Sequence, residues 1–227
     1  MIEHSSIEHH IQRHIIGVLM YQKYARFRDM RPPKVDTNLY SYHLKLLQRR
    51  NIVKRTTDGY TLDKFGILYV DRVTTSTLKI RTQPKIIVML VVQNSNGDLL
   101  LFQRARQPFT GQYTLPYGKI HIDDESLEAA ARREAVEKLR LKNQMPVHAG
   151  DCYIRVRDKG NGEIIMSTLA HIFRLNADDI ELDDRQEWVR PHKLTQYDLA
   201  PAVEQIVTRT FFRDPYFFEE YEEVLEF

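Results

Sequence analysis

The chain has 227 residues, 42% hydrophobic and 28% charged. This composition excludes a disordered chain and allows one large or two small domains with their own cores. The longest apolar run, Ile86–Val92, is too short to span a bilayer, and residues 1–10 lack the apolar core of a secretory signal. The single cysteine, Cys152, excludes an intrachain disulfide. We therefore expect a cytoplasmic protein without membrane contacts.

Charge is unevenly divided along the chain. Residues 1–80 contain 14 Lys and Arg against 7 Asp and Glu, whereas residues 81–227 contain 19 against 24. A basic N-terminal part favours contact with a polyanion such as nucleic acid. Ordinary scatter of surface charge is the alternative interpretation.

Helical spacing of apolar residues predicts three helices in the N-terminal part, at residues 5–22, 37–50 and 63–73. The expected N-capping residues are Ser5 or Ser6, Asp36 or Thr37, and Asp63. Asn51 stands where the second helix ends and tolerates the left-handed conformation that a helix C-terminus favours.

A hairpin is predicted between the second and third helices. Residues 52–56 and 60–62 are short strand candidates around Asp58-Gly59. Asp-Gly is typical of a type I′ turn, which needs positive φ. The polar stretch 74–84 has no clear period and places a domain boundary near residue 80.

Helix, basic segment, helix, hairpin and helix is the order of a winged helix-turn-helix. Residues 41–47 (SYHLKLL), 51–53 (NIV) and 58–62 (DGYTL) resemble the recognition helix and wing of ArsR-type bacterial repressors. The resemblance covers about residues 6–73. It implies a domain that binds double-stranded DNA as a homodimer, because a palindromic operator mirrors a twofold axis.

The resemblance assigns roles to individual residues. Leu44, Leu47 and Ile52 are expected in the core. The residues expected to contact DNA are Asn38, Ser41, Tyr42 and Lys45 in the major groove, and Arg49, Lys54 and Arg55 on phosphates. A winged helix that binds protein or only dimerises is the alternative. His10 and His14 lie one turn apart and suggest a metal site, but a third ligand is missing.

Beyond residue 80 the pattern changes to strands and helices. The predicted elements are strands at 86–93 and 99–103, a helix at 126–139, strands at 151–157, 164–174 and 187–190, and a helix at 199–210. The aromatic and acidic tail 211–227 is interpreted as a helix that packs on its own domain or on a dimer mate. A partner-binding tail is the alternative.

Residues 118–141, GKIHIDDESLEAAARREAVEKLRL, resemble the Nudix box, G-x5-E-x7-R-E-U-x-E-E-x-G-U with U aliphatic. The resemblance covers about residues 85–210 and implies an α/β/α sandwich with a mixed sheet. The whole chain is then an α/β (α+β) protein with a winged helix at 1–80 and a Nudix-like domain at 81–227. Nudix enzymes hydrolyse nucleoside diphosphates linked to another group, with Mg²⁺ or Mn²⁺.

This resemblance implies that Glu134 and Glu137 are catalytic and that both bind the metal together with Gly118. Glutamates at this spacing share one helix face and offer the oxygen ligands that Mg²⁺ and Mn²⁺ prefer. Such a metal neutralises the diphosphate and helps to activate water. The residues expected to bind the nucleotide-type ligand are Arg104, Arg106, Glu125 and Arg133.

The box is degenerate at four positions. Tyr117 and Arg140 replace glycines, Glu125 lies one residue too far from Gly118 while Asp124 lies too far from Arg133, and Lys138 replaces a glutamate. Lys138 follows Glu134 by four residues, the order that favours an ion pair. Its ammonium group is expected where a divalent cation would bind, which predicts weak metal binding and reduced hydrolysis. Compensation by Asp123, Asp124, Glu125 or the carboxylates of 178–184 is the alternative.

The predicted function is a DNA-binding transcriptional regulator whose degenerate Nudix domain senses a nucleotide-type metabolite without a cofactor. The first alternative is an active pyrophosphohydrolase of nucleoside diphosphate derivatives that needs Mg²⁺ or Mn²⁺ and has an accessory winged helix. The second is a scaffold for protein contacts.

Overall fold

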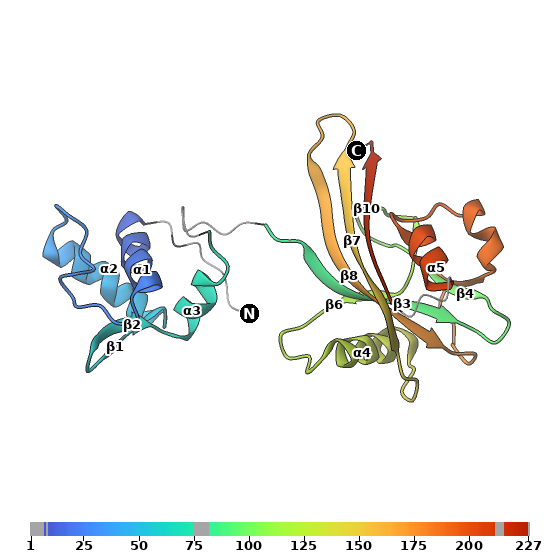
Figure 1. The fold of residues 1–227 in the computed structure, drawn as a ribbon, viewed down its shortest axis with the longest axis horizontal. Coiled ribbons are helices and arrows are strands. Elements are labelled where there is room, and N and C mark those ends of the chain that lie inside the picture. Colours follow the sequence, from blue (N-terminus) through green and yellow to red (C-terminus); the bar gives the residue numbers. More distant parts are fainter. Residues whose placement is uncertain (1–6, 8, 75–81, 212–215, 227) are drawn as a thin grey trace. The chain divides into compact units, whose positions relative to one another are not determined.

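The computed structural model describes residues 7, 9–74, 82–211 and 216–226. The chain divides into two compact units, Met1–Thr82 and Gln83–Phe227 (Figure 1). The boundary predicted near residue 80 falls within residues 75–81, outside the described residues, and stays a prediction. Over the described ranges, no helix has both the length and the apolar character that a membrane crossing needs.

The N-terminal unit contains three helices and a hairpin. Its elements are α1 (His10–Tyr21), α2 (Thr37–Arg49), β1 (Val53–Thr56), β2 (Gly59–Leu62) and α3 (Lys64–Val70). The helix predicted from residue 5 begins at His10, because the His9 side chain caps it by accepting from the Ile11 amide. Ser5 and Ser6 lie outside the described residues. The order of elements is the predicted one, and the winged-helix assignment stays a prediction.

Capping residues set the ends of α2 and α3. Asp36 accepts hydrogen bonds from the amides of Asn38 and Leu39, and Asp63 accepts from Lys64. Asn51 adopts the predicted positive φ, +52°. The apolar stripes of α1 and α2 meet in one core, and Leu44, Leu47 and Ile52 are buried in it as predicted.

The β1–β2 hairpin forms where predicted, with a different turn. A type I′ turn needs positive φ at both loop residues, Thr57 and Asp58, whereas the positive φ here belongs to Gly59 (+135°). The predicted turn type is therefore wrong. The glycine is needed because Ala25 pairs with Tyr60, and a Cβ at Gly59 would lie 2.7 Å from the Ala25 carbonyl oxygen.

The C-terminal unit is built on an eight-stranded mixed sheet with the order β10-β7-β8-β3-β4-β5, in which β6 also pairs with β3 and β9 with β4. The strands are β3 (Lys85–Gln93), β4 (Leu99–Gln103), β5 (Tyr113–Thr114), β6 (Tyr117–Lys119), β7 (Val147–Asp158), β8 (Ile164–Asn176), β9 (Gln186–Val189) and β10 (Phe217–Leu225). The helices are α4 (Leu127–Leu139), the 3₁₀ helix η1 (Pro191–Gln196) and α5 (Val203–Phe211).

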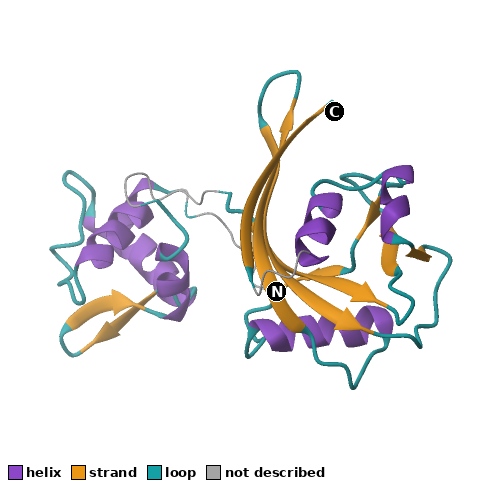
Figure 2. Cartoon of the chain, turned by 45° about the vertical axis from the view of Figure 1, so that its right-hand side comes forward, coloured by secondary structure: helices purple, strands orange, loops and turns teal. Residues whose placement is uncertain are grey.

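Helices cover both faces of this sheet (Figure 2). Val88 and Leu90 of β3 pack in the α4 core, whereas Ile87 and Met89 pack in the core with α5. Burial on both faces explains why β3 is an uninterrupted apolar run rather than an alternating one. The α+β class and the mixed sheet are confirmed.

The tail forms a strand, so its predicted helix is wrong. Strand β10 pairs in parallel with β7, with Phe217 opposite Gly150, and its exposure alternates with period two. The two carboxylates on its less exposed face both have partners. Glu219 forms an ion pair with Arg209, and Glu223 accepts a hydrogen bond from the Ala202 amide. The helix predicted at 199–210 forms, but it begins four residues later, at Val203.

Strands β3 and β4 pair only at Gln93 and Leu99, next to their connecting turn. Beyond this point β3 continues with β6, and β4 continues with β5 and β9. The divergence places the segment 114–118 beside the C-terminal half of α4, where a pocket opens.

Candidate functional site

An open pocket of about 540 Å³ lies between the end of β4, the segment 114–118, α4 and the loop 183–186. Its charged lining residues are Arg104, Arg106, Glu137, Lys138, Asp183 and Arg185. Four cations against two carboxylates favour an anionic ligand. Arg104, Arg106, Gly118 and Glu137 are therefore brought together here. The loop 183–186 adds Asp183, one of the carboxylates of 178–184 considered as compensation for the lost glutamate, and Arg185, which no sequence motif indicated.

Helix α4 begins and ends as its residues dictate. The Ser126 hydroxyl caps it by accepting from the Ala129 amide, 3.1 Å away. Arg140 ends it with φ +58°, the left-handed conformation expected where the box has glycine. Alanines on one face of the helix pack closely on the sheet. Glu134 is buried on that side, whereas Glu137 is exposed toward the pocket.

Both carboxylate oxygens of Glu134 are bound by cations. Oε1 accepts from Arg133 Nη1 at 2.6 Å, and Oε2 lies 2.9 Å from Lys138 Nζ. The Glu134 side chain is only 5% exposed. A Cβ at Gly118 would lie 1.7 Å from the Glu134 carboxyl carbon, so only glycine lets this carboxylate pack against β6.

Asp124 and the Arg133 guanidinium form a bidentate ion pair. Arg133 Nε and Nη2 donate to the two Asp124 oxygens at 2.9 and 2.8 Å, and Nη2 also donates to the Lys119 carbonyl. These hydrogen bonds, followed by one from the His121 amide, hold the pKa of Asp124 well below its usual range. Arg133 thus acts inside the protein and does not line the pocket. Glu125, also predicted to bind the ligand, is exposed and does not line the pocket, and Asp124 is the carboxylate that binds Arg133.

Tyr117, which replaces the glycine that usually precedes the box, lies between two cations that line the pocket. Arg104 Nη1 donates to its hydroxyl at 2.6 Å, and Lys138 Nζ lies 5.1 Å from its ring centroid. Arg104 Nε donates to the Pro108 carbonyl at 2.9 Å. From the sequence, Tyr117 stood out only as a departure from the Nudix pattern. Its contact with Arg104 could not be predicted, because the two residues come from separate segments that only the folded sheet brings together.

The donor set around Glu134 does not fit Mg²⁺ or Mn²⁺. These ions need several free oxygen ligands in a near-octahedral arrangement. Both oxygens of Glu134 face cations instead, and the Glu137 carboxylate lies 3.7 Å from Arg133 Nη1. Gly118 and Glu134 are adjacent, as the predicted metal set requires, but the Lys138 ammonium group, which also lines the pocket, occupies Glu134 Oε2.

The residues predicted to contact DNA lie on the surface of the N-terminal unit. Exposed positions are Asn38, Tyr42, Lys45 and Arg49 of α2 and Lys54 and Arg55 of β1, while Ser41 is half-buried. Lys54 forms an exposed ion pair with Asp63 at 3.7 Å. The remaining cationic side chains of this set offer donors to phosphates.

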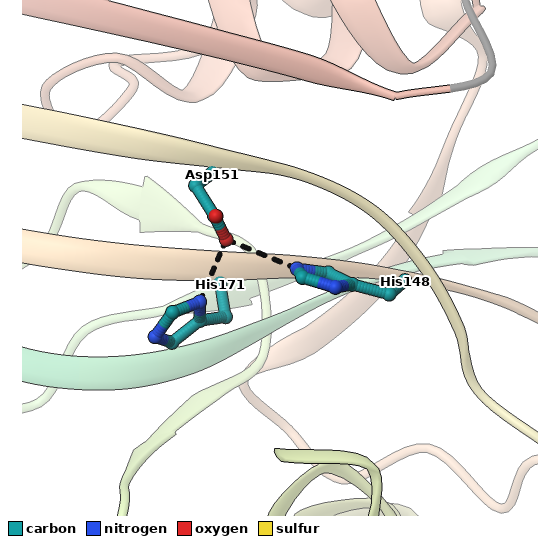
Figure 3. Close-up of side chains that lie close together, drawn as sticks. All are labelled: His148, Asp151 and His171. Atoms are coloured by element: carbon teal, nitrogen blue, oxygen red, sulfur yellow. Dashed lines mark hydrogen bonds and ion pairs between the residues drawn. The ribbon is translucent and has the colours of Figure 1, made fainter.

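The N-terminal histidines gather differently from the predicted pair His10 and His14. His9 stacks on His10 and on His43, with ring centroids 4.6 and 3.7 Å apart. Gln12 Nε2 lies 3.2 Å from His43 Nδ1. Burial lowers the pKa of His43, and the neighbouring His9 and His10 lower it further. Potential metal ligands instead converge in the C-terminal unit, at His148, Asp151 and His171 (Figure 3).

Comparison with known proteins gives one family and several distant structures. The model of the NUDIX domain family matches residues 83–210. The mutator MutT protein of Bacillus halodurans is 18% identical, with 61% of this chain and 89% of that chain covered at a TM-score of 0.49. The NUDIX domain of Shewanella oneidensis NrtR, solved with ADP ribose, is 19% identical, with 63% and 94% covered at 0.45.

A longer NrtR chain of Shewanella oneidensis, solved with a 27mer DNA, is 20% identical, with 55% of this chain covered at a TM-score of 0.44. The present chain spans 59% of that chain's length. The family match begins at residue 83 and does not extend into the N-terminal unit.

Proposed function

The chain belongs to the Nudix family, and we propose that it is a DNA-binding regulator whose Nudix domain binds a nucleotide-type ligand without hydrolysing it. The observation that carries the proposal is the pairing of both Glu134 oxygens with Arg133 and Lys138. This arrangement leaves neither oxygen of Glu134 free for a metal ion and places the Lys138 ammonium at the pocket.

Phosphate recognition is the chemistry that the pocket favours. Arg104, Arg106, Lys138 and Arg185 line it, and arginine forks suit the paired oxygens of a diphosphate. Arg104 is held in place by Tyr117 and by the Pro108 carbonyl, so little of its mobility is lost on binding. Phe102 and Leu115 add apolar lining beside these charges, as a nucleoside requires.

Hydrolysis is disfavoured by the same residues. In active Nudix enzymes a divalent metal supplies charge neutralisation and an activated water. Here a second cation would meet the Lys138 ammonium, and Glu134 has no free oxygen to receive a proton from water. Nucleotide therefore binds and leaves unchanged.

DNA contact is assigned to the N-terminal unit. Asn38, Tyr42 and Lys45 recur on one side of α2, and Arg49 ends the same face. Ligand binding changes DNA affinity only if the ligand binds the DNA-competent state and the free state differently. A homodimer would match a palindromic operator.

Two binding experiments test the proposal on the full chain. Isothermal titration with ADP-ribose, a dinucleotide, a nucleotide sugar and a nucleoside triphosphate should give metal-independent binding to at least one ligand. Arg104→Ala should weaken that binding at least tenfold, whereas Arg174→Ala, an exposed change outside the pocket lining, should not. Equal affinities of the two variants would contradict the assigned pocket.

Titration with duplexes selected for binding to the chain tests the proposed DNA contact. Affinity should fall steeply with salt, because phosphate neutralisation releases counterions. Lys45→Ala with Arg49→Ala should reduce affinity and the salt slope, whereas Lys193→Ala, outside the N-terminal unit, should change neither. A chain with no duplex affinity would instead favour a scaffold for protein contacts.

The exposed carboxylate of Glu137 favours a second candidate, a metal-dependent pyrophosphohydrolase. Its side chain is 56% exposed and lines the pocket, so it is available to a ligand. Mg²⁺-dependent turnover that Glu137→Gln reduces would support this candidate.

A further inference from the structure

A bulge in β7 puts three ligand-type side chains on one side of the sheet. His148 and Asp151 are three residues apart, a spacing that in a regular strand places side chains on opposite faces. The register shifts between His148 and Gly150, so one extra residue is accommodated and both side chains reach the same face. His171 of β8 is the direct cross-strand partner of Asp151.

The three side chains converge on one carboxylate oxygen (Figure 3). Asp151 Oδ1 lies 3.0 Å from His148 Nε2 and 2.6 Å from His171 Nδ1. The three ligand atoms all lie within 4.8 Å of one another. Zinc–ligand bonds of about 2.0–2.2 Å give a tetrahedral edge of roughly 3.3 Å, so small side-chain shifts suffice to surround one ion.

Neighbouring residues fix these side chains in place. His148 stacks on Phe173, with centroids 4.8 Å apart and planes 17° from parallel. The Tyr216 hydroxyl donates to Asp151 Oδ2, leaving Oδ1 for the histidines. Gly150 permits this contact, because a Cβ there would lie 2.4 Å from the Phe217 carbonyl oxygen and would push β10 away.

The carboxylate is ionised, as a metal ligand must be. Burial raises the pKa of Asp151, but hydrogen bonds from Tyr216, His171 and His148 outweigh it and lower the pKa below its usual value. The hydrogen bond to Asp151 raises the pKa of Tyr216 to about 12, so Tyr216 stays a hydrogen-bond donor. This supporting contact to a ligand's second oxygen is typical of metal sites.

We propose that His148, Asp151 and His171 form a binding site for a divalent first-row transition metal of the zinc class. Two imidazoles with one carboxylate select Zn²⁺, Co²⁺ or Ni²⁺ over Mg²⁺ and Ca²⁺. The ligand side chains are 25%, 18% and 14% exposed, so an ion reaches them and water completes the coordination. None of the three lines the Nudix pocket.

The bound ion ties β7 to β8 and, through Tyr216, to the start of β10. An ion that binds only the folded state stabilises it by linkage. Zn²⁺ should therefore raise the Tm of the full chain, and His171→Gln should abolish this increase.

Cobalt titration of the full chain tests the site. A background with His9→Asn, His10→Gln and His14→Gln removes adventitious binding by the N-terminal histidines. We expect one Co²⁺ per chain, with the intense visible bands of tetrahedral Co²⁺, displaced by Zn²⁺. His148→Gln, Asp151→Asn and His171→Gln should each weaken binding at least tenfold, whereas His192→Gln and Glu137→Gln should not.

Absence of the tetrahedral spectrum, unchanged affinity in His171→Gln, or loss of binding in Glu137→Gln would each overturn the proposal. If a variant of the three ligands fails to fold, chemical modification of the chain that lacks only the N-terminal histidines still tests the site. Zn²⁺ should protect His148 and His171 from diethyl pyrocarbonate while His192 reacts as before. Equal modification with and without Zn²⁺ would overturn the site.

Discussion

Lys138 Nζ lies 2.9 Å from Glu134 Oε2, one helical turn away, and the Glu134 side chain is 5% exposed. The ammonium thus neutralises a nearly buried carboxylate that also accepts from Arg133. Loss of this cation would leave a buried negative charge with one partner fewer, a state that recruits another cation. The pair therefore explains both the stability of the helix face and its poor fit for a divalent ion.

Lys138→Glu should increase Mn²⁺ affinity, because the substitution removes the competing ammonium and adds a carboxylate beside Glu134. Without metal the variant should be less stable, since two carboxylates face each other at i,i+4. Mn²⁺ titration and thermal unfolding with and without Mn²⁺ measure both effects. Arg132→Glu reverses an exposed charge on the same helix and controls for net charge. If both variants bind Mn²⁺ equally, the role given to Lys138 is wrong.

Gly118→Ala should destabilise the C-terminal unit by about 2 kcal/mol, because the added Cβ overlaps the Glu134 carboxylate, which two ion pairs hold in place. Urea unfolding of the full chain measures the change. Gly160→Ala is the matched control, since its Cβ would meet its nearest neighbour at 3.5 Å, an ordinary contact. Equal stabilities of the two variants would contradict the close packing.

Much of the α4 region was predictable from the sequence, whereas the detail of its contacts was not. Local signals, the Ser126 cap and the apolar spacing, define the helix, and the i,i+4 spacing of Glu134 and Lys138 predicts their ion pair. The choice of Asp124 over Glu125 as the partner of Arg133 depends on how the loop before the helix folds. Spacing alone could not decide between them, because Asp124 has the box spacing from Gly118 and Glu125 has the box spacing from Arg133.

The β10 strand and the histidine cluster depend on long-range pairing, which explains why sequence reasoning missed them. Aromatic residues and glutamates in the tail fit either a helix or an alternating strand, and only the pairing with β7 decides between them. His148 and His171 meet Asp151 through a bulge and a cross-strand register. The strand was predicted only from Asp151, whereas β7 begins at Val147, so His148 lay outside the predicted strand.

Arg140→Gly should stabilise the protein by about 1 kcal/mol, because Arg140 holds a φ of +58° that glycine adopts without steric cost. The exposed ion pair between Arg140 and Glu181 is lost as well, but such pairs contribute little. Glu181→Gln measures that loss separately. Chemical denaturation of both variants decides the point, and a less stable Arg140→Gly chain would contradict it.

Acid should remove the stabilisation that Asp124 supplies. Hydrogen bonds from Arg133 and the His121 amide lower the pKa of this carboxyl in the folded state. The pKa of an aspartate in an unfolded chain is about 3.9. The unfolded chain therefore binds this proton first, and the contribution is complete above about pH 5 and declines as the pH falls below about 4.

Asp124→Asn should flatten this part of the stability profile, measured as the free energy of unfolding between about pH 6 and pH 3. Asp123→Asn, at an exposed neighbour in the same loop, should retain it. Parallel profiles for the wild type and Asp124→Asn would show that the Arg133 contact does not depend on the ionised carboxylate.

One paired measurement decides whether the pocket binds nucleotide without hydrolysing it. Ligands found by titration are incubated with the full chain and Mg²⁺ or Mn²⁺, beside Glu134→Gln, and products are separated by chromatography. We expect bound, intact ligand and the same background rate in both proteins. Metal-dependent turnover by the wild type that Glu134→Gln abolishes would contradict it and make this chain an active Nudix hydrolase.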